Sequence, residues 1–431
     1  MKDKGSIRIE LPEDVRYIIG AFEEAGFEAF AVGGCIRDSL LSRKPEDWDI
    51  TTSARPEEIK SIFGRTVDTG IKHGTVTVLI KHSLSEFNPD KYELRPYEVT
   101  TYRVDGEYKD GRHPEKVSFS PSLKEDLRRR DFTVNAMAYN DTKGLVDEFD
   151  GLSDMEAGII RCVGDPDERF SEDALRILRA VRFEAQLGFG IEEQTAGAIR
   201  GHAANLSLVS KERIQAELSK LICSSHPERV AELWRLCMAE HICGGFSELS
   251  PEIFAELSEA SGGFSELPLR DKYKRYAILL SGQEPSRAQS ILRELRLDND
   301  TIAKAVFLVK ELFVPIKSDS YDIKLRMQPV TRELFSELIG LKELFAGTKQ
   351  YKELCVPEDI KSVRSIFERI VRRDEPVYLK ELIVKGSDLI KAGMEPGEEV
   401  GSLLRLMHDD VLRHPEHNSI LFLFSRYLYN G

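Results

Sequence analysis

The chain has 431 residues, of which 41% are hydrophobic and 31% charged, and a formal net charge of −13. This length exceeds what one hydrophobic core usually serves, so we expect two to four folded units. No run of about 18 apolar residues occurs, which argues against a membrane-spanning protein. The negative charge excludes a uniformly basic nucleic-acid binder, so any contact with RNA must use local basic patches.

The N-terminus and the cysteines bear on the cellular compartment. The first residues, MKDKGSIRIELPEDV, lack the basic and then apolar pattern of a signal peptide, so we expect a cytoplasmic protein. The six cysteines show no C-x-x-C spacing. This spacing predicts free, mostly buried thiols, with no disulfide and no zinc site.

Strand and helix signals alternate over the first 140 or so residues. Residues rich in β-formers occupy 27–34, 47–52, 74–80 and 97–103, and a helical segment lies at 56–64. These runs predict an α+β unit, a mixed sheet covered by helices.

From about residue 150 onward helical periodicity dominates, as in "SKERIQAELSKLI" at 210–222. We therefore expect an N-terminal α+β unit followed by three all-helical units, with the divisions at 1–145, 146–225, 226–320 and 321–431.

Two aspartates lie one residue apart in "DWDITT". In a strand, Asp47 and Asp49 would point to the same face and Trp48 to the other. Two carboxylates side by side repel each other, and a divalent cation with oxygen ligands, such as Mg²⁺, relieves that repulsion. The pair is a candidate Mg²⁺ site, although such pairs also occur on ordinary surface strands.

Gly33 and Gly34 follow an apolar run directly. Glycines at the start of a helix let backbone N–H groups approach a phosphate closely, so glycines near carboxylates indicate a nucleoside triphosphate site. The alternative is a turn that needs a positive φ.

A third pattern lies in "DPDERFSEDALRILRAVRF" at 165–183. Asp173 and Arg176 are three residues apart, so on one helix they would share a face and place an acceptor beside a donor. Cytosine and adenine both offer an amino donor next to a ring-nitrogen acceptor, whereas uracil and guanine present the reverse order. Such a pair would select C and A; the alternative is a surface ion pair.

Together these segments resemble the class II tRNA nucleotidyltransferases, or CCA-adding enzymes, and the related bacterial poly(A) polymerases. The resemblance rests on G-G-x-x-R-D with D-x-D, on the "YEVTTYR" strand, on R-R-D-F-T-x-N-A and on E-D-x-x-R, which here are Gly33, Gly34, Arg37, Asp38, Asp47, Asp49, Glu98, Arg129, Arg130, Asp131, Asn135, Glu172, Asp173 and Arg176. "SKERIQAEL" resembles a buttressing helix of the family, and residues 384–418 resemble its C-terminal region.

The resemblance implies a nucleotidyltransferase head, a neck, a body and a tRNA-binding tail for the four units. It implies template-independent addition of CMP, CMP and AMP to the 3′ end of tRNA from CTP and ATP, by a two-metal transfer with Mg²⁺. Asp47, Asp49 and Glu98 would be catalytic, with Asp47 and Asp49 holding the metal. The nucleotide would be bound by Gly33, Gly34, Arg37, Arg130, Asp131, Asn135, Asp173, Arg176, Arg179 and Arg182.

Some alternatives stay open. The polar segment 103–119 resembles a flexible loop of enzymes that add the complete CCA, but terminal-A addition, CC addition and poly(A) synthesis share most of these motifs. A more distant alternative is an inactive tRNA-binding protein. Residues 81–96 are longer than the family pattern, and we expect a surface excursion there. His408-Asp409 is expected to be structural rather than part of a phosphohydrolase site, and the oligomeric state stays open.

Overall fold

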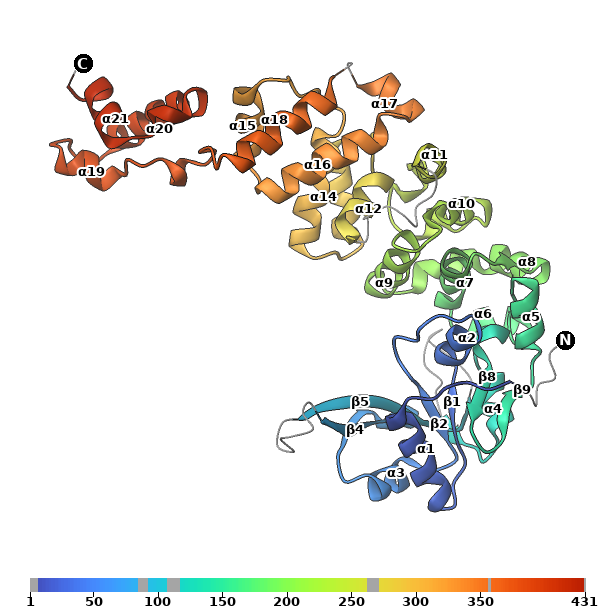
Figure 1. Cartoon of the computed structure of the whole chain (residues 1–431). Coiled ribbons are helices and arrows are strands. Elements are labelled where there is room, and N and C mark those ends of the chain that lie inside the picture. Colours follow the sequence, from blue (N-terminus) through green and yellow to red (C-terminus); the bar gives the residue numbers. More distant parts are fainter. Residues whose placement is uncertain (1–6, 84–91, 107–116, 262–270, 356–357, 430–431) are drawn as a thin grey trace. The chain divides into compact units, whose positions relative to one another are not determined.

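The structure is a computed structural model that describes residues 7–83, 92–106, 117–261, 271–355 and 358–429 (Figure 1). The chain forms two compact units. The first comprises Met1–Glu248 and Glu294–Arg296, and the second comprises Leu249–Arg293 and Leu297–Gly431. Within the described residues, every helix is too short or too polar to cross a bilayer.

A mixed sheet of seven strands organises the first unit, in the order β3-β4-β5-β2-β1-β8-β9. β2 and β5 are parallel, and the other neighbouring strands are antiparallel. The strands are β1 (Ala29–Val32), β2 (Ile50–Thr52), β3 (Thr66–Gly70), β4 (Thr75–Ser83), β5 (Tyr92–Thr101), β8 (Met137–Asn140) and β9 (Gly144–Asp147). The predicted α+β head with a mixed sheet is confirmed.

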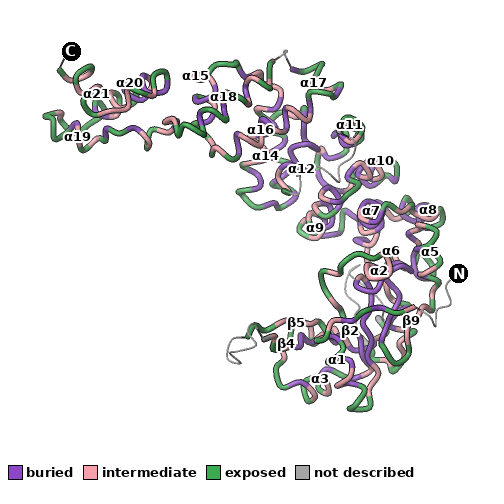
Figure 2. The backbone as a smooth tube through the Cα atoms, in the orientation of Figure 1, coloured by how far each residue is buried: buried purple, intermediate pink, exposed green. Residues whose placement is uncertain are grey.

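The centre of this sheet is buried on both faces. All four residues of β1 and of β8 are buried, and Figure 2 colours this part of the sheet as buried. Helix α1 (Glu13–Glu24) contributes Val15, Ile18 and Phe22 to the core, at the spacing of an apolar helix face. The other helices of the head are α2 (Gly34–Leu40), α3 (Pro56–Ile62) and α4 (Leu123–Arg128).

The described part of the segment 81–96 lies mostly at the surface, as expected. There it lengthens a β-hairpin, because β4 pairs with β5 from Thr75↔Thr100 to Ser83↔Tyr92. The loop expected at 103–119 begins and ends in a strand pair, β6 (Arg103–Asp105) with β7 (Val117–Phe119). Its middle, 107–116, lies outside the described residues.

Helices follow the sheet in the first unit. They are α5 (Gly151–Ala157), α6 (Pro166–Glu172), α7 (Leu175–Leu187), α8 (Glu193–His202), α9 (Lys211–Ile222) and α10 (Glu232–Arg235). Two short strands, β10 (Ile159–Ile160) and β11 (Gly190–Ile191), pair in parallel within this helical part. Helix α7 packs against α9, whose Ile214, Leu218 and Leu221 are buried. The expectation that the 210–218 segment supports the neck agrees with this packing.

The described residues of the second unit form helices without strands. They are α11 (Glu252–Ser261), α12 (Lys272–Leu279), α13 (Pro285–Glu294), α14 (Asn299–Glu311), α15 (Ser320–Met327), α16 (Arg332–Phe345), α17 (Lys349–Leu354), α18 (Ile360–Arg372), α19 (Gly386–Lys391), α20 (Glu398–Arg413) and α21 (Ile420–Tyr427). A separate apolar cluster around Leu389, Met407 and Leu423 holds the last three together. His408 is buried, and the Asp409 carboxylate accepts from the Tyr321 hydroxyl.

Candidate active site

Asp47 and Asp49 lie at the entrance to a central strand, not within it. β2 begins at Ile50, so the prediction of a strand from residue 47 was three residues too long. The ladder nevertheless continues through the backbone of Asp49, whose carbonyl oxygen accepts from the Val32 N–H at 3.0 Å. β2 and β5 are parallel with Ile50 opposite Val99, so Asp49 comes next to Glu98 in register.

The charges of these carboxylates act on one another. The pKa of Asp49 is raised above its ordinary value. Neighbouring protein atoms desolvate the carboxylate and contribute most to this rise, although the residue keeps an exposed surface; Glu98 and Asp47 add to it, and Arg130 opposes it. The structure thus gathers the three predicted acidic residues at one place, where like charges repel.

Gly33 is the N-cap of α2, with φ +83°, a conformation that suits glycine. Its N–H donates to the Met137 carbonyl oxygen at 3.1 Å and therefore continues the sheet rather than facing a ligand. A Cβ at this position would lie 3.0 Å from Nη1 of Arg130. The glycine therefore makes room for a guanidinium group and has the positive φ of the turn alternative, and close approach of a phosphate to this backbone stays a prediction.

Arg37 ties α2 to the end of the sheet. Its side chain is buried and donates through Nη1 to Oδ1 of Asn135 at 2.5 Å. Its Nε and Nη2 donate to Oδ1 of Asp38 at 2.9 and 2.8 Å. Two residues 98 positions apart, both predicted to bind nucleotide, are thus hydrogen-bonded to each other.

Asp126 is a residue that the sequence analysis missed. Its carboxylate has no exposed surface and accepts from Arg129 at 2.7 Å, from Arg130 at 3.4 Å and from the Thr51 hydroxyl at 3.0 Å. Burial alone would raise its pKa, but the two guanidinium groups outweigh burial and hold the pKa below its ordinary value. The i,i+3 and i,i+4 spacing of Asp126 to the two arginines is the signal that could have identified it.

Asp131 joins the head to helix α7. Nε and Nη2 of Arg179 lie 2.8 and 2.6 Å from its Oδ2. Its Oδ1 accepts from Nδ2 of Asn135 at 3.3 Å and from the backbone N–H of Phe132 at 2.9 Å. Although burial opposes ionisation, the charge of Arg179 outweighs it, so the pKa of Asp131 lies well below its ordinary range.

Arg182 faces a second acid that the sequence analysis did not identify as functional. Its Nε lies 2.8 Å from Oε2 of Glu217, and both side chains are buried. Burial and the neighbouring charge of Arg179 lower the pKa of Arg182 to about 10. The guanidinium carbons of Arg37, Arg179 and Arg182 all lie 4.0 to 5.4 Å from the centre of the Phe183 ring. Three cations thus gather around one aromatic ring.

Asp173 and Arg176 do not share one helix, and that part of the prediction was wrong. Asp173 is the C-cap of α6 in an extended conformation, and Arg176 lies in the first turn of α7. The Asp173 carboxylate accepts from the backbone N–H of Leu175 at 3.0 Å and from Arg213 at 2.7 Å. Local capping by an aspartate side chain competes with helix continuation.

Arg176 is held by partners other than Asp173. It donates to the Glu172 carboxylate, to the Arg169 carbonyl oxygen at 3.1 Å and to the Arg129 carbonyl oxygen at 3.0 Å. Asp173 and Arg176 stay close through the turn, in which the Arg176 N–H donates to the Asp173 carbonyl oxygen at 3.0 Å. The neck residues are therefore adjacent, but separate networks orient them.

The arrangement favours binding of a cation and a polyanion. Three carboxylates that repel one another suit a divalent cation, and the cluster of guanidinium groups suits phosphate oxygens. Nε of Arg130 is buried and lacks a hydrogen-bond partner among the described residues. Burial raises the pKa of the Cys35 thiol to about 12, so this cysteine, directly after the glycine pair, is not a thiolate nucleophile at neutral pH.

Family models match two parts of the first unit. A model described as the poly A polymerase head domain matches residues 29–161. A second model, described as a probable RNA and SrmB-binding site of polymerase A, matches residues 188–250. The two matched ranges contain the acidic residues and Asp131 in the first case, and Arg213 and Glu217 in the second.

Relatives cover nearly the whole chain. The CCA-adding enzyme of Pediococcus pentosaceus is 48% identical over 93% of this chain and 95% of its own length. That of Limosilactobacillus fermentum is 36% identical over 93% and 92%. The crystal structure of the Bacillus stearothermophilus CCA-adding enzyme in complex with CTP, 28% identical, matches with a TM-score of 0.72 over 95% of this chain and 96% of that chain.

Proposed function

The chain belongs to the family of CCA-adding enzymes, and on this premise we propose that it adds CMP, CMP and AMP to the 3′ end of tRNA, using CTP and ATP and releasing pyrophosphate. The observation that carries the proposal is the convergence of Asp47 and Asp49, just before the start of β2, with Glu98 on the neighbouring strand β5, in a chain of this family. Enzymes of this class generally use divalent metal ions.

We propose Mg²⁺ as the ion and Asp47 and Asp49 as its ligands. The donor set fits, because all the groups are carboxylate oxygens; desolvation is the main cause of the raised pKa of Asp49, and the charges of Glu98 and Asp47, which a cation would compensate, add to it. Bound Mg²⁺ would supply polarisation of the α-phosphate and stabilisation of the attacking and leaving oxygens. Glu98 adds a third negative charge to this site.

The basic residues have separate tasks in the proposal. Arg130, whose side chain keeps 19% of its surface exposed, is suited to donate to a phosphate oxygen through its guanidinium group. Arg37 and Asn135 fix the position of α2 beside it, while Arg179 and Arg182 surround Asp131 and Glu217 and keep the neck helix aligned with the head. Gly33 leaves the space that the Arg130 guanidinium occupies, and Gly34 begins the helix.

Base selection would use Asp173 and Arg176. A carboxylate has about four acceptor directions, so beyond its bonds to Leu175 and Arg213, Asp173 can accept from the amino group of cytosine or adenine. Arg176 would donate to the adjacent ring nitrogen. Uracil and guanine present the reverse order and would leave polar groups unpaired, at roughly 1–3 kcal/mol each.

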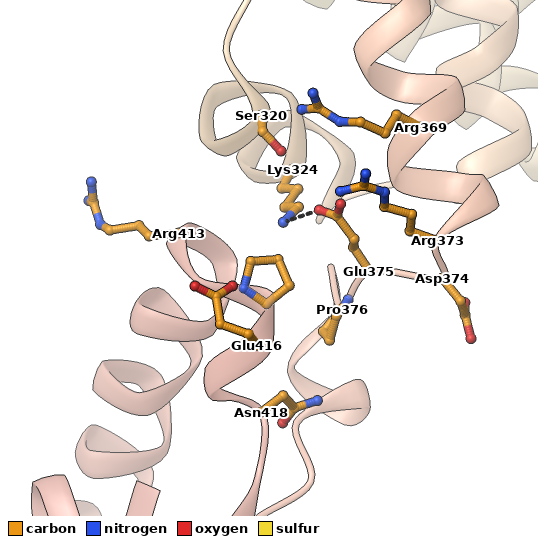
Figure 3. A pocket seen from close by; sticks show the side chains of 11 residues that line it. Ser320, Lys324, Arg369, Arg373, Asp374, Glu375, Pro376, Arg413, Glu416 and Asn418 are labelled. Carbon is orange, nitrogen blue, oxygen red and sulfur yellow. Dashed lines mark ion pairs between the residues drawn. The ribbon is translucent and has the colours of Figure 1, made fainter. Parts of the chain in front are cut away.

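The proposed domain ranges and cellular compartment also rest on membership of this family. We propose the head at 1–145, the neck at 146–225, the body at 226–320 and a tRNA-binding tail at 321–431, in a cytoplasmic protein. A cavity of about 760 Å³ in the second unit is lined by Lys324, Arg369, Arg373 and Arg413 and also by Asp374, Glu375 and Glu416 (Figure 3), and its basic side chains are suited to RNA phosphates. This cavity belongs to the other unit from the acidic residues, so it is suited to the tRNA body rather than to the chemistry.

The experiment is incorporation of radiolabelled CTP or ATP into tRNAs that end at the discriminator base, at C or at CC. The proposal expects two C additions and then a single A. A long tail with ATP alone would establish a poly(A) polymerase, and A addition only to CC ends would establish a partial enzyme. The Asp47→Ala variant should lose incorporation while tRNA binding survives; retained turnover would remove the metal-binding role, and no turnover by the wild type would favour an inactive tRNA-binding protein.

A further inference from the structure

A cluster of two histidines and a glutamate lies outside the proposed active site, in the short segment between α20 and α21. The sequence there is His-Pro-Glu-His, and its middle forms a 3₁₀ turn, Pro415–His417. One ligand atom each from His414, Glu416 and His417 lies within 4.8 Å of the others. We propose that these three side chains bind a divalent first-row transition-metal ion, with Zn²⁺ as the best match. The expectation of no zinc site came from the cysteine spacing, and this cluster contains no cysteine.

A buried carboxylate prepares His417 for this task. Oδ2 of Asp410 lies 3.2 Å from Nδ1 of His417, and only 7% of the Asp410 side chain is exposed. This contact places the imidazole proton on Nδ1 and leaves the lone pair of Nε2 for a metal. A carboxylate on the far ring nitrogen is the usual support of a metal-bound histidine.

The position of His417 is also fixed by packing. Its ring stacks on Phe422, with 3.8 Å between centroids and an interplanar angle of 21°, and lies 4.7 Å from the ring of His414. The next residue, Asn418, accepts from the Ile383 N–H at 2.8 Å and donates to the Glu381 carbonyl oxygen at 3.1 Å. The turn is therefore held in place by contacts that do not depend on a metal.

The donor set decides which ion fits. Two imidazoles with one carboxylate suit Zn²⁺, which takes a water as a fourth ligand, whereas Mg²⁺ and Ca²⁺ prefer oxygen ligands only. Bonds of about 2.0–2.2 Å in a tetrahedron place ligand atoms about 3.3–3.6 Å apart. His414 and Glu416 have 52% and 70% exposed side chains and can turn inward by the remaining distance.

A bound ion would join both ends of the segment 414–417 between α20 and α21. Because Asp410 and Phe422 orient His417 only in the folded tail, binding should be tighter there and would stabilise that fold by mass action. Glu416 also lines the basic cavity of the same unit, so a metal would neutralise one of its acidic groups. The site itself does not depend on the proposed nucleotidyl transfer.

The test is a Zn²⁺ titration of the metal-free full-length chain by calorimetry, with excess Mg²⁺ present to occupy the oxygen-ligand site. One equivalent of Zn²⁺ should bind and raise the thermal midpoint, and Co²⁺ should give visible absorption of a tetrahedral site. His414→Ala and His417→Ala should each lose this equivalent, and Asp410→Asn should weaken binding by about 10–100-fold. His414 is more than half exposed, so its variant should fold normally.

His226→Ala is the matched control. His226 lies 3.2 Å from Glu228, so it has a carboxylate neighbour, but within the described residues no third ligand completes a site there. This variant should bind Zn²⁺ like the wild type. Equal Zn²⁺ binding by the wild type and by a His414→Ala/His417→Ala double variant, or no stoichiometric binding by the wild type, would overturn the proposal.

Discussion

In the first unit Asp49 lies beside Glu98 and Asp47, and desolvation, helped by these like charges, raises its pKa. In the second unit Lys342 is fully buried, and its ammonium group donates to three acceptors: the carbonyl oxygens of Leu312 and Val314 at 2.9 and 2.7 Å and the Glu358 carboxylate at 2.9 Å, although burial still lowers its pKa. The first arrangement is incomplete without a ligand, and the second is complete in itself. A cluster of like charges indicates a ligand-binding site, whereas a buried charge that is paired with acceptors indicates a structural role.

Replacing an acid of the repelling group should give the largest effect. We expect Asp49→Asn to lower CMP incorporation by about 10⁴-fold, because metal binding supplies several kcal/mol of transition-state stabilisation. The thermal midpoint should stay equal or rise, because the substitution relieves repulsion. Asp68→Asn, an exposed acid paired with Lys60, is the control. A large loss of stability in Asp49→Asn would show that the acids are structural.

Replacing the paired cation Lys342 should lower the stability of the protein rather than its CMP incorporation. Lys342→Met leaves the Glu358 carboxylate without its cation and should lower the free energy of unfolding by about 3–5 kcal/mol. The midpoint of urea unfolding measures this effect. Lys349→Met, at an exposed pair with Glu353, should change it by less than about 0.5 kcal/mol. Similar midpoints for both variants would contradict the view of this pair as scaffold.

Glu184 on α7 offers a test by pH. Burial, helped by the charge of Glu232, raises its pKa to about 7, against an ordinary value of 4.5. The part of the free energy of unfolding that depends on protonated Glu184 is therefore fully present below about pH 4.5 and is lost as the pH rises through about 7. We expect Glu184→Gln to stabilise the protein more at about pH 8 than at about pH 4.5, by at most about 3 kcal/mol. Thermal unfolding at the two pH values, with exposed Glu168→Gln as control, checks this; a pH-independent effect would refute it.

The smallest effect concerns selectivity. Arg176→Ala should reduce the preference for CTP over UTP by about 5–150-fold, which corresponds to 1–3 kcal/mol for an unpaired polar group. The ratio of kcat/KM for the two nucleotides measures it. Arg200→Ala, at an exposed arginine of α8, should leave the ratio unchanged. Unchanged selectivity in Arg176→Ala would remove its role in base reading.

The strands and motif residues that depend on local sequence pattern could be predicted from the sequence. Runs of β-formers identified β1, β2, β4 and β5, and the parallel pairing of two of them brought Glu98 next to Asp49. The motifs also identified Arg37 and Asn135, although their mutual hydrogen bond over 98 positions could not be read from spacing.

The errors have physical causes. Helical periodicity continues through 166–187, yet the Asp173 side chain bonds to the Leu175 N–H and interrupts the helix, a choice that periodicity does not encode. Arg213 lies 40 positions from Asp173, and Glu217 lies 35 positions from Arg182. Only the packing of α9 on α7 brings the side chains of Arg213 and Glu217 to their partners.

The buried carboxylate of Asp126 has a consequence for how such chains diverge. It is shared by Thr51, Arg129 and Arg130, so exchanging it for a neutral residue removes the carboxylate that both guanidinium groups contact, and exchanging one arginine leaves the acid partly uncompensated. We therefore expect these four positions to be substituted together or to be retained together. In a protein that has lost the catalytic activity of the head, the four residues could change independently, so their joint loss would indicate that the activity is lost.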